Sequence, residues 1–168
     1  MNESLFTQGS LQIRGMSSEE IDSYLANKLD EDTKWRSRCR DVTLEKAKEQ
    51  VENEWNLLMP MGPHESLGHS FLAFQAHGEE EVELIVFGGA WLQLSLGQEG
   101  LLHGFDILPA HRGKGIGKIA LEALHAFARL HLDIRLIRCR CYGANDKSVN
   151  LMASVGYRVS EVNMLKVL

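Results

Sequence analysis

Two stretches in the first sixty residues repeat apolar side chains at helical spacing. Ser17-Ser18-Glu19-Glu20 has the S-x-x-E form of a capping box, and the apolar residues after it recur every three or four positions. This pattern predicts a helix that begins near Ser18. A second amphipathic helix is predicted over residues 43–58, and the helix-breaking residues Pro60 and Pro63 follow it.

The pattern becomes strand-like after residue 69. Three β-rich segments joined by short turns are predicted as strands, at residues 70–77, 82–96 and 101–108. The first of the connecting turns is placed at residues 78–81. Gly88-Gly89 interrupts the middle segment and indicates a bulge or a close approach of the backbone. Because the connections are short, an antiparallel meander is expected.

The last third of the chain alternates between helix and strand patterns. A helical stripe runs from Ile116 to Leu130, and residues 134–142 alternate apolar side chains with arginine as in a strand. A short helix follows Asn145 and ends at Gly156, after which residues 157–168 can supply one or two strands. The order of elements predicts an α+β fold with a βαβ element.

Composition narrows the class of protein. A chain of 168 residues with 44% hydrophobic content is expected to form one domain, residues 1–168, with a substantial core. The net charge of -5 argues against a nucleic-acid-binding protein. The apolar runs fall far short of the roughly 20 residues that span a bilayer, and the N-terminus does not resemble a secretory signal. We therefore expect a cytoplasmic protein without membrane association.

The three cysteines, Cys39, Cys139 and Cys141, show no disulfide or metal-binding pattern. Cys139 and Cys141 lie two positions apart on a predicted strand, which is a poor geometry for a disulfide. No second pair of cysteines or histidines stands at zinc-ligand spacing. Reduced thiols and no bound metal are expected.

A loop rich in glycine and cations lies between a predicted strand and the helix at 116. Its glycines remove Cβ atoms where the first N–H groups of the helix lack carbonyl partners. Its cations add positive charge around the same point. The residues concerned are Arg112, Gly113, Lys114, Gly115, Gly117 and Lys118. Helix N-termini of this kind bind phosphate, so a phosphate or pyrophosphate ligand is predicted.

Two common nucleotide-binding motifs fit this loop poorly. Walker A requires serine or threonine where Ile119 stands. Residues 115–120 do match the looser Rossmann form G-x-G-x-x-A. However, that form needs an acidic residue about 20 positions later, where Arg138 and Arg140 stand instead.

The segment Arg112-Gly113-Lys114-Gly115-Ile116-Gly117 resembles the R/Q-x-x-G-x-G/A signature of the GCN5-related N-acetyltransferases (GNAT). Residues 145–157 are similar to that family's N-x-x-A-x-x-L-Y-x-x-x-G-F/Y segment, and the resemblance is best over residues 88–168. It implies a GNAT-like α+β fold. The central sheet is then mixed but mainly antiparallel, with six to seven strands, and about four helices flank it.

The resemblance also implies roles. In this family the backbone N–H groups of the loop hold the pyrophosphate of coenzyme A, so acetyl-CoA is the implied co-substrate. The strand before the loop supplies a backbone N–H to the thioester carbonyl, a catalytic role that the resemblance assigns to Leu108. The implied cofactor-binding residues are Ile107, Leu108, Arg112, Gly113, Lys114, Gly115, Ile116, Gly117, Lys118, Asn145 and Ser148.

One residue departs from the family pattern. The family commonly has a tyrosine, thought to protonate the departing thiolate, where this chain has Met152. Methionine cannot donate a proton. Because a thiol has a pKa of about 8.5, the thiolate is a tolerable leaving group, and water or Tyr142 could protonate it.

Acetyl transfer to an amine also requires a base, because the acceptor's ammonium must lose a proton before attack. His103 is the candidate, since it is expected to share a strand face with Phe105 and Ile107 near the thioester. Further candidates are Asp106, Glu83, Glu65 and His69.

These features predict an N-acetyltransferase that moves an acetyl group from acetyl-CoA to a primary amine by direct attack in a ternary complex. The acceptor is a small-molecule amine or a protein amine, which the sequence does not distinguish, and the resemblance allows a homodimer. The alternative, prompted by Met152, is a non-catalytic acyl-CoA-binding sensor or regulatory module.

Overall fold

The computed structural model describes residues 6–8, 10–77 and 84–166, so the turn expected at 78–81 lies outside the described residues. The chain divides into two compact units, each built from two segments. One unit comprises Met1–Glu20 and Leu67–Arg140, and the other comprises Ile21–Ser66 and Cys141–Leu168. Because each unit combines an early and a late segment, they are not consecutive domains. The single domain stays a prediction.

The first unit contains a mixed sheet. Its strands are β1 (Phe6–Gln8), β2 (Leu11–Gly15), β3 (His69–His77), β4 (Leu84–Ser95), β5 (Glu99–Ile107) and β6 (Leu136–Cys139). They lie side by side in chain order, antiparallel except for the parallel β5–β6 pair. The mainly antiparallel sheet and the meander of β3, β4 and β5 are therefore confirmed. Among the described residues, only five of these strands are longer than three residues, so the sheet falls short of the six to seven strands expected.

Two segments differ from the expectation. β1 and β2 form an N-terminal hairpin that the pattern did not predict, because β2 has only five residues and one of its buried side chains is Arg14. In contrast, residues 157–166 form no strand, although one or two were expected there. Several apolar side chains of this segment are exposed, namely Val159, Val162, Met164 and Leu165. Alternating apolar residues do not make a strand unless another strand pairs with them.

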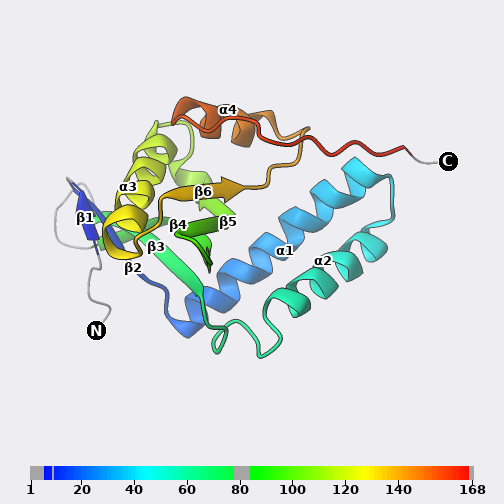
Figure 1. Ribbon diagram of the computed structural model, residues 1–168, viewed down its shortest axis with the longest axis horizontal. Helices are drawn as coiled ribbons and strands as arrows, with labels where there is room; N and C mark the ends of the chain where they lie inside the picture. Colours follow the sequence, from blue (N-terminus) through cyan, green and yellow to red (C-terminus); the bar gives the residue numbers. More distant parts are fainter. Residues whose placement is uncertain (1–5, 9, 78–83, 167–168) are drawn as a thin grey trace. The chain divides into compact units, whose positions relative to one another are not determined.

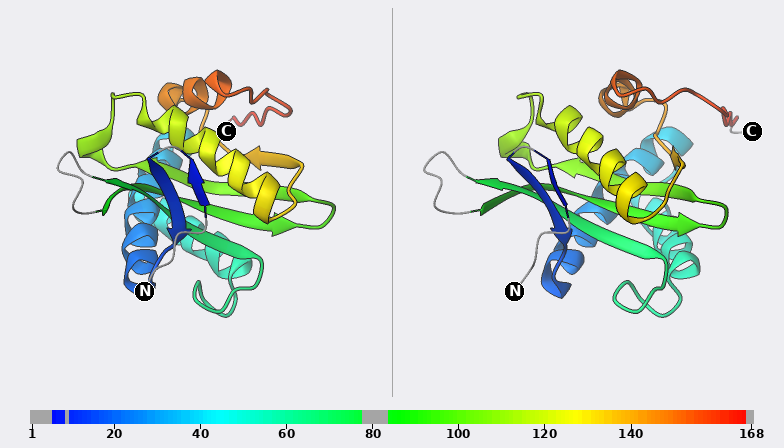
Figure 2. Two further views of the ribbon diagram at one scale, coloured as in Figure 1. Left: turned by 90° about the vertical axis from the view of Figure 1, so that its left-hand side faces the viewer. Right: turned by 60° about the vertical axis from the view of Figure 1, so that its left-hand side comes forward.

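Helix α3 (Ile116–His131) covers part of the sheet in the first unit, where it contacts β1, β2 and β5 (Figure 2). The predicted stripe is largely confirmed, since Ala120, Ala123, Leu124 and Phe127 are buried. The stripe is narrower than predicted, because Ile119, near its start, and Leu130, at its end, are exposed.

The second unit is helical. It contains most of α1 (Ser18–Arg40), together with α2 (Leu44–Leu58) and α4 (Asp146–Ser154). α1 and α2 form an antiparallel hairpin joined by an ion pair between Arg36 and Glu54 (Figure 1). With α3, the described residues form four α-helices, as expected. No helix in the described ranges has the length and apolar character needed to cross a membrane.

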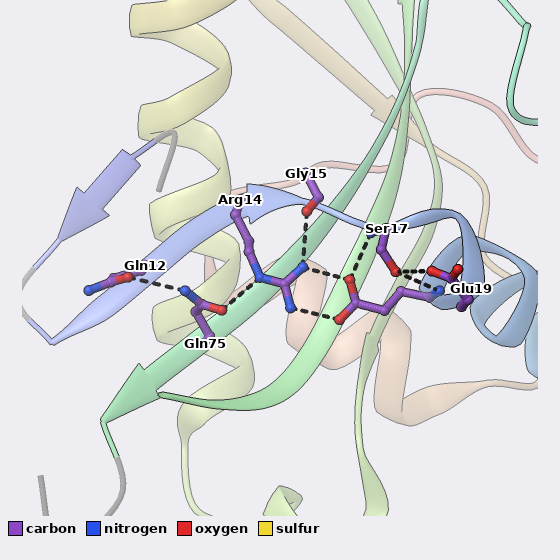
Figure 3. Close-up of polar contacts among 7 residues, drawn as sticks. Gln12, Arg14, Gly15, Ser17, Glu19 and Gln75 are labelled. Atoms are coloured by element: carbon purple, nitrogen blue, oxygen red, sulfur yellow. Dashed lines mark hydrogen bonds and ion pairs between the residues drawn. The ribbon is translucent and has the colours of Figure 1, made fainter. Parts of the chain in front are cut away.

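Arg14 is a buried cation at the centre of a hydrogen-bond network in the first unit (Figure 3). Its Nε donates to Gln75 Oε1 at 2.8 Å, and its two terminal nitrogens donate to the Glu20 carboxylate at 2.6 Å each. Glu20 also accepts from the Ser17 backbone N–H, and its own N–H donates to Ser17 Oγ, which is the predicted capping box. The hydrogen bonds from Arg14 hold the pKa of the Glu20 carboxyl below its usual value. The network thus joins β2 and β3 to the first turn of α1.

We expect Glu20→Gln to lower the free energy of unfolding by about 1–2 kcal/mol at neutral pH, because it leaves the buried Arg14 without its anionic partner. The pKa of Glu20 is lower in the folded than in the unfolded chain. Its contribution is therefore present above the unfolded pKa and disappears as the pH falls through the folded pKa. Urea denaturation of both proteins at neutral and acidic pH measures this, and the difference should narrow in acid.

The matched control is Asp30→Asn, which breaks an exposed ion pair with Lys34. It should change the stability by less than about 0.5 kcal/mol. Equal losses in the two variants would contradict a special role for the Arg14 network.

Candidate functional site

Within the part of the chain that the structure describes, the last residues of β5 have a strand neighbour on only one side. β4 pairs with β5 as far as Ile107, whereas β6 pairs with it only from Glu99 to Leu102. The Leu108 N–H donates to the Phe87 carbonyl at 2.8 Å, on the β4 side. Since N–H groups alternate in direction along an antiparallel strand, those of Phe105 and Ile107 point to the side that β6 leaves uncovered. An extended ligand on that side could bond to β5 as another strand would.

This geometry corrects one prediction. Leu108 was expected to supply the N–H for a thioester carbonyl, but its N–H continues the ladder between β4 and β5. The Ile107 N–H has the required direction instead. The sequence could not distinguish these neighbours, because the direction of each N–H depends on the register of β5 against β4.

β4 and β5 come unusually close at Gly88, which pairs with Ile107. A Cβ on Gly88 would lie 2.4 Å from the Asp106 carbonyl oxygen and 3.0 Å from Cδ1 of Ile107. The close approach indicated by Gly88-Gly89 in the sequence is therefore confirmed. Gly88 allows β4 to hold the end of β5 in place beside the uncovered side.

We expect Gly88→Ala to destabilise the protein by about 1–3 kcal/mol, because the added methyl group meets backbone atoms that cannot rotate away. Gly15→Ala is the control, since a Cβ at Gly15 meets nothing within 4 Å. That change should stay within about 0.5 kcal/mol of the wild type. Thermal and urea denaturation measure both effects. A Gly88→Ala variant as stable as Gly15→Ala would contradict the close approach.

The glycine loop joins the end of β5 to α3 through a short 3-10 helix, η1 (Pro109–His111). Gly113 has a φ of 78° and Gly115, the N-cap residue of α3, a φ of 77°. Glycine adopts this left-handed backbone without cost, whereas other residues do not. A Cβ at either position would meet nothing within 4 Å. The backbone at the start of α3 therefore borders open space, and the N–H groups of Ile116 and Gly117 belong to the first turn, where helices bind anions.

The three cations of the loop are not equivalent. Arg112 donates from Nε to the Ile107 carbonyl at 2.6 Å and pairs with Asp106 at 2.8 Å. Its side chain therefore ties the loop to the end of β5. Lys118 lies 3.9 Å from Glu122, one turn along α3, and the Lys114 side chain is exposed. Lys114 and Lys118 are thus better placed than Arg112 to attract an anion.

His103 lies at an irregularity in β5. Trp91 pairs with Gly104 but Leu92 pairs with Leu102, so His103 is an extra residue at a bulge. Its ring stacks on Trp91 with centroids 4.5 Å apart, and its Nε2 lies 2.7 Å from Gln93 Oε1.

The bulge makes one expectation wrong. His103 was expected to share a face with Phe105 and Ile107. Phe105 instead contacts Phe74, whereas the Trp91 ring beneath His103 contacts Phe71. Phe71 and Phe74 are three residues apart on β3 and so lie on opposite faces of the sheet.

The other predicted residues lie in the second unit. Asn145 is the N-cap of α4, and its Oδ1 accepts from the Ser148 N–H at 3.2 Å. Met152 is buried, so it belongs to the core of the unit. Tyr142 stacks on Trp35, its hydroxyl lies 3.5 Å from Nε of Arg36, and burial raises the pKa of that hydroxyl.

The remaining candidates for a base have different surroundings. Asp106 is paired with Arg112, and Glu65 is an exposed loop residue. His69 lies beside Trp91, and Glu83 falls outside the described residues. Within the described ranges, no group of three or more histidine, cysteine or carboxylate side chains could hold a metal ion.

Comparisons with known proteins agree with this fold. A sequence model of the acetyltransferase (GNAT) family matches residues 32–157. An uncharacterized N-acetyltransferase, YdgE, from Bacillus subtilis is 24% identical over 157 residues, which cover 92% of this chain and 96% of that protein. The solved structure of YycN from Bacillus subtilis has a TM-score of 0.82 at 24% identity and covers 94% of this chain and 98% of its own.

A spermidine N-acetyltransferase from Vibrio cholerae, solved in complex with CoA and spermine, shares the fold at lower similarity. Its TM-score is 0.57 at 14% identity, and the match covers 89% of this chain and 81% of that one. Because the family model spans most of the chain, the protein belongs to the GNAT acetyltransferase family. The α+β GNAT-like fold, with its mixed sheet and four helices, is confirmed.

Proposed function

We propose that this protein transfers an acetyl group from acetyl-CoA to an amine. The observation that carries the proposal is the start of α3, where two left-handed glycines border open space. The first-turn N–H groups of a helix, which lack carbonyl partners within the helix, begin there. Family membership supports the reaction, and the CoA and spermine bound to the Vibrio cholerae relative support the two kinds of substrate.

The proposed coenzyme A site uses mainly backbone groups. The N–H groups of Ile116 and Gly117 bind the pyrophosphate, and Lys114 and Lys118 add charge attraction. The N–H groups of Phe105 and Ile107 bind the pantetheine arm and the thioester carbonyl along the uncovered side of β5. Asn145 and Ser148 stay as predicted contacts to the pantetheine or phosphate portion.

In the proposed reaction, the amine attacks the thioester carbonyl directly. His103 stays the predicted base, although its ring lies on the opposite face of the sheet from Phe105, and it accepts the proton that the ammonium form of the acceptor must lose. The Ile107 N–H stabilises the negative charge that develops on the carbonyl oxygen. The new C–N bond forms as the C–S bond breaks. The attacking nitrogen releases its second proton as the amide forms, and the thiolate of coenzyme A takes up a proton. Holding both substrates in one place supplies much of the rate.

The source of the proton that the CoA thiolate takes up distinguishes an acetyltransferase from a non-catalytic acyl-CoA-binding module. Met152 is buried and cannot donate one. Tyr142 stays a candidate acid, because its phenol carries a proton that it can donate. If neither Tyr142 nor water supplies the proton, the protein is an acyl-CoA-binding module without turnover, which is the alternative function.

Calorimetry tests the proposed cofactor site. We expect binding of acetyl-CoA and CoA but not of NAD, and we expect Gly115→Leu to weaken CoA binding at least about tenfold, or about 1.4 kcal/mol. The leucine side chain would enter the space proposed for the pyrophosphate.

Gly97→Leu is the matched control, because Gly97 also has a positive φ, 81°, and a Cβ there meets nothing within 4 Å. Both variants should lose similar stability, and only Gly115→Leu should lose affinity. Binding of NAD alone, or equal effects of the two variants on CoA affinity, would remove the loop as the cofactor site.

Turnover is tested with a panel of polyamines, aminoglycosides, small amines and peptide N-termini, assayed for release of CoA. With an accepted amine, His103→Ala should lower kcat about 10²–10⁴-fold and remove the fall in rate at low pH, because that fall reports protonation of the base. His77→Ala, at an exposed position on β3, is the control. An acidic limb that persists in His103→Ala would exclude His103 as the base. CoA binding without turnover of any amine would favour the non-catalytic alternative.

A further inference from the structure

The indole of Trp91 lies between two histidines and contacts them in different ways. Trp91 is fully buried, and its Nε1 donates to Nδ1 of His69 at 2.8 Å. An indole nitrogen is only a donor, so Nδ1 of His69 must be the acceptor and carries no proton. His69 is therefore held as the neutral tautomer with its proton on Nε2.

His103 contacts the face of the same indole. The two rings are 4.5 Å apart and inclined by 27°. Consider the tautomer in which Nε2 of His103 donates to Gln93 Oε1. A second proton then adds at Nδ1. The hydrogen bond to Gln93 persists, because both nitrogens of an imidazolium are donors. The face of an indole also attracts a cation. His103 can therefore accept a proton and keep both its hydrogen bond to Gln93 and its stacking on Trp91.

His69 cannot do the same. A proton on its Nδ1 would face the indole N–H, and a buried N–H without an acceptor is destabilising. The rings of His69 and His103 are 6.1 Å apart, so a charge on one also opposes a charge on the other. Of this pair, His103 is the one suited to take a proton, and His69 is suited to stay neutral.

We propose that His69 is a positioning residue, which acts through Trp91 to hold the indole face beneath the ring of His103. This inference rests on the proposed function, in which the acceptor's proton moves to His103. Phe71 stacks on Trp91 at 5.5 Å, so apolar packing also locates the indole, and the hydrogen bond to His69 adds a directional restraint. The sequence could not reveal these contacts, because 34 positions separate the two histidines and Trp91 lies on a third strand.

Two substitutions at residue 69 distinguish the effect of the hydrogen bond to Trp91 from the effect of side-chain size. His69→Leu removes the acceptor, whereas the amide oxygen of His69→Asn can replace Nδ1. His69→Leu is expected to lower kcat about tenfold to a hundredfold and to leave the KM for acetyl-CoA nearly unchanged. His69→Asn should keep most of the wild-type kcat.

A double mutant tests whether His69 acts through His103. If it does, His69→Leu combined with His103→Ala should be no slower than His103→Ala alone. Additive losses, equal losses in His69→Leu and His69→Asn, or full activity of His69→Leu would each overturn the proposal.

NMR of the free protein supplies a readout that needs no acceptor. Ring-nitrogen spectra should show a proton on Nε2 and none on Nδ1 of His69, and the Trp91 indole N–H should exchange slowly with solvent. In His69→Leu the indole N–H should exchange faster and the His103 ring signals should move, while His69→Asn should resemble the wild type. A proton on Nδ1 of His69, or unchanged His103 signals in His69→Leu, would overturn the positioning role. A wild-type protein that acetylates no amine would count against the proposed function alone, because these spectra do not depend on turnover.

Discussion

The point at which β6 stops pairing with β5 determines the rest of the site. β6 ends opposite Leu102, while β4 continues to Ile107 and Gly88 keeps the two strands in close contact. Among the described strands, the end of β5 therefore pairs with β4 on one side and with no strand on the other. The same stretch leads through η1 to the glycines at the start of α3, so two sets of backbone donors follow one another within about a dozen residues. A ligand that is extended at one end and anionic at the other fits this order of groups.

Binding and chemistry depend on different parts of the chain. The proposed cofactor site is made of backbone N–H groups, which many side-chain substitutions would leave intact. The proposed proton transfer depends on single side chains, namely His103 with the indole beneath it, and an acid that Met152 cannot be. A protein of this kind could retain cofactor binding after losing turnover. The same division explains why the loop sequence predicts a cofactor class but says nothing of the acceptor.

Local signals in the sequence predicted local structure well. The capping residues Ser17 and Asn145 and the loop glycines were identified because their chemistry involves only near neighbours. The failures are non-local. The N–H direction at Leu108 and the face of His103 both depend on the register and the bulge between β4 and β5. β2 was missed because its buried Arg14 is compensated by Gln75 and Glu20 from other elements. No pattern within one segment could show these pairings.

Backbone amide NMR during a titration with CoA tests the proposed site most directly. The amide signals of Phe105, Ile107, Ile116 and Gly117 should shift most, because their N–H groups gain acceptors in the proposed complex. The Leu108 amide should move less, since its N–H already donates to the Phe87 carbonyl. Saturable binding of CoA that leaves the signals of the glycine loop and of Ile107 unchanged would contradict the assignment of this site.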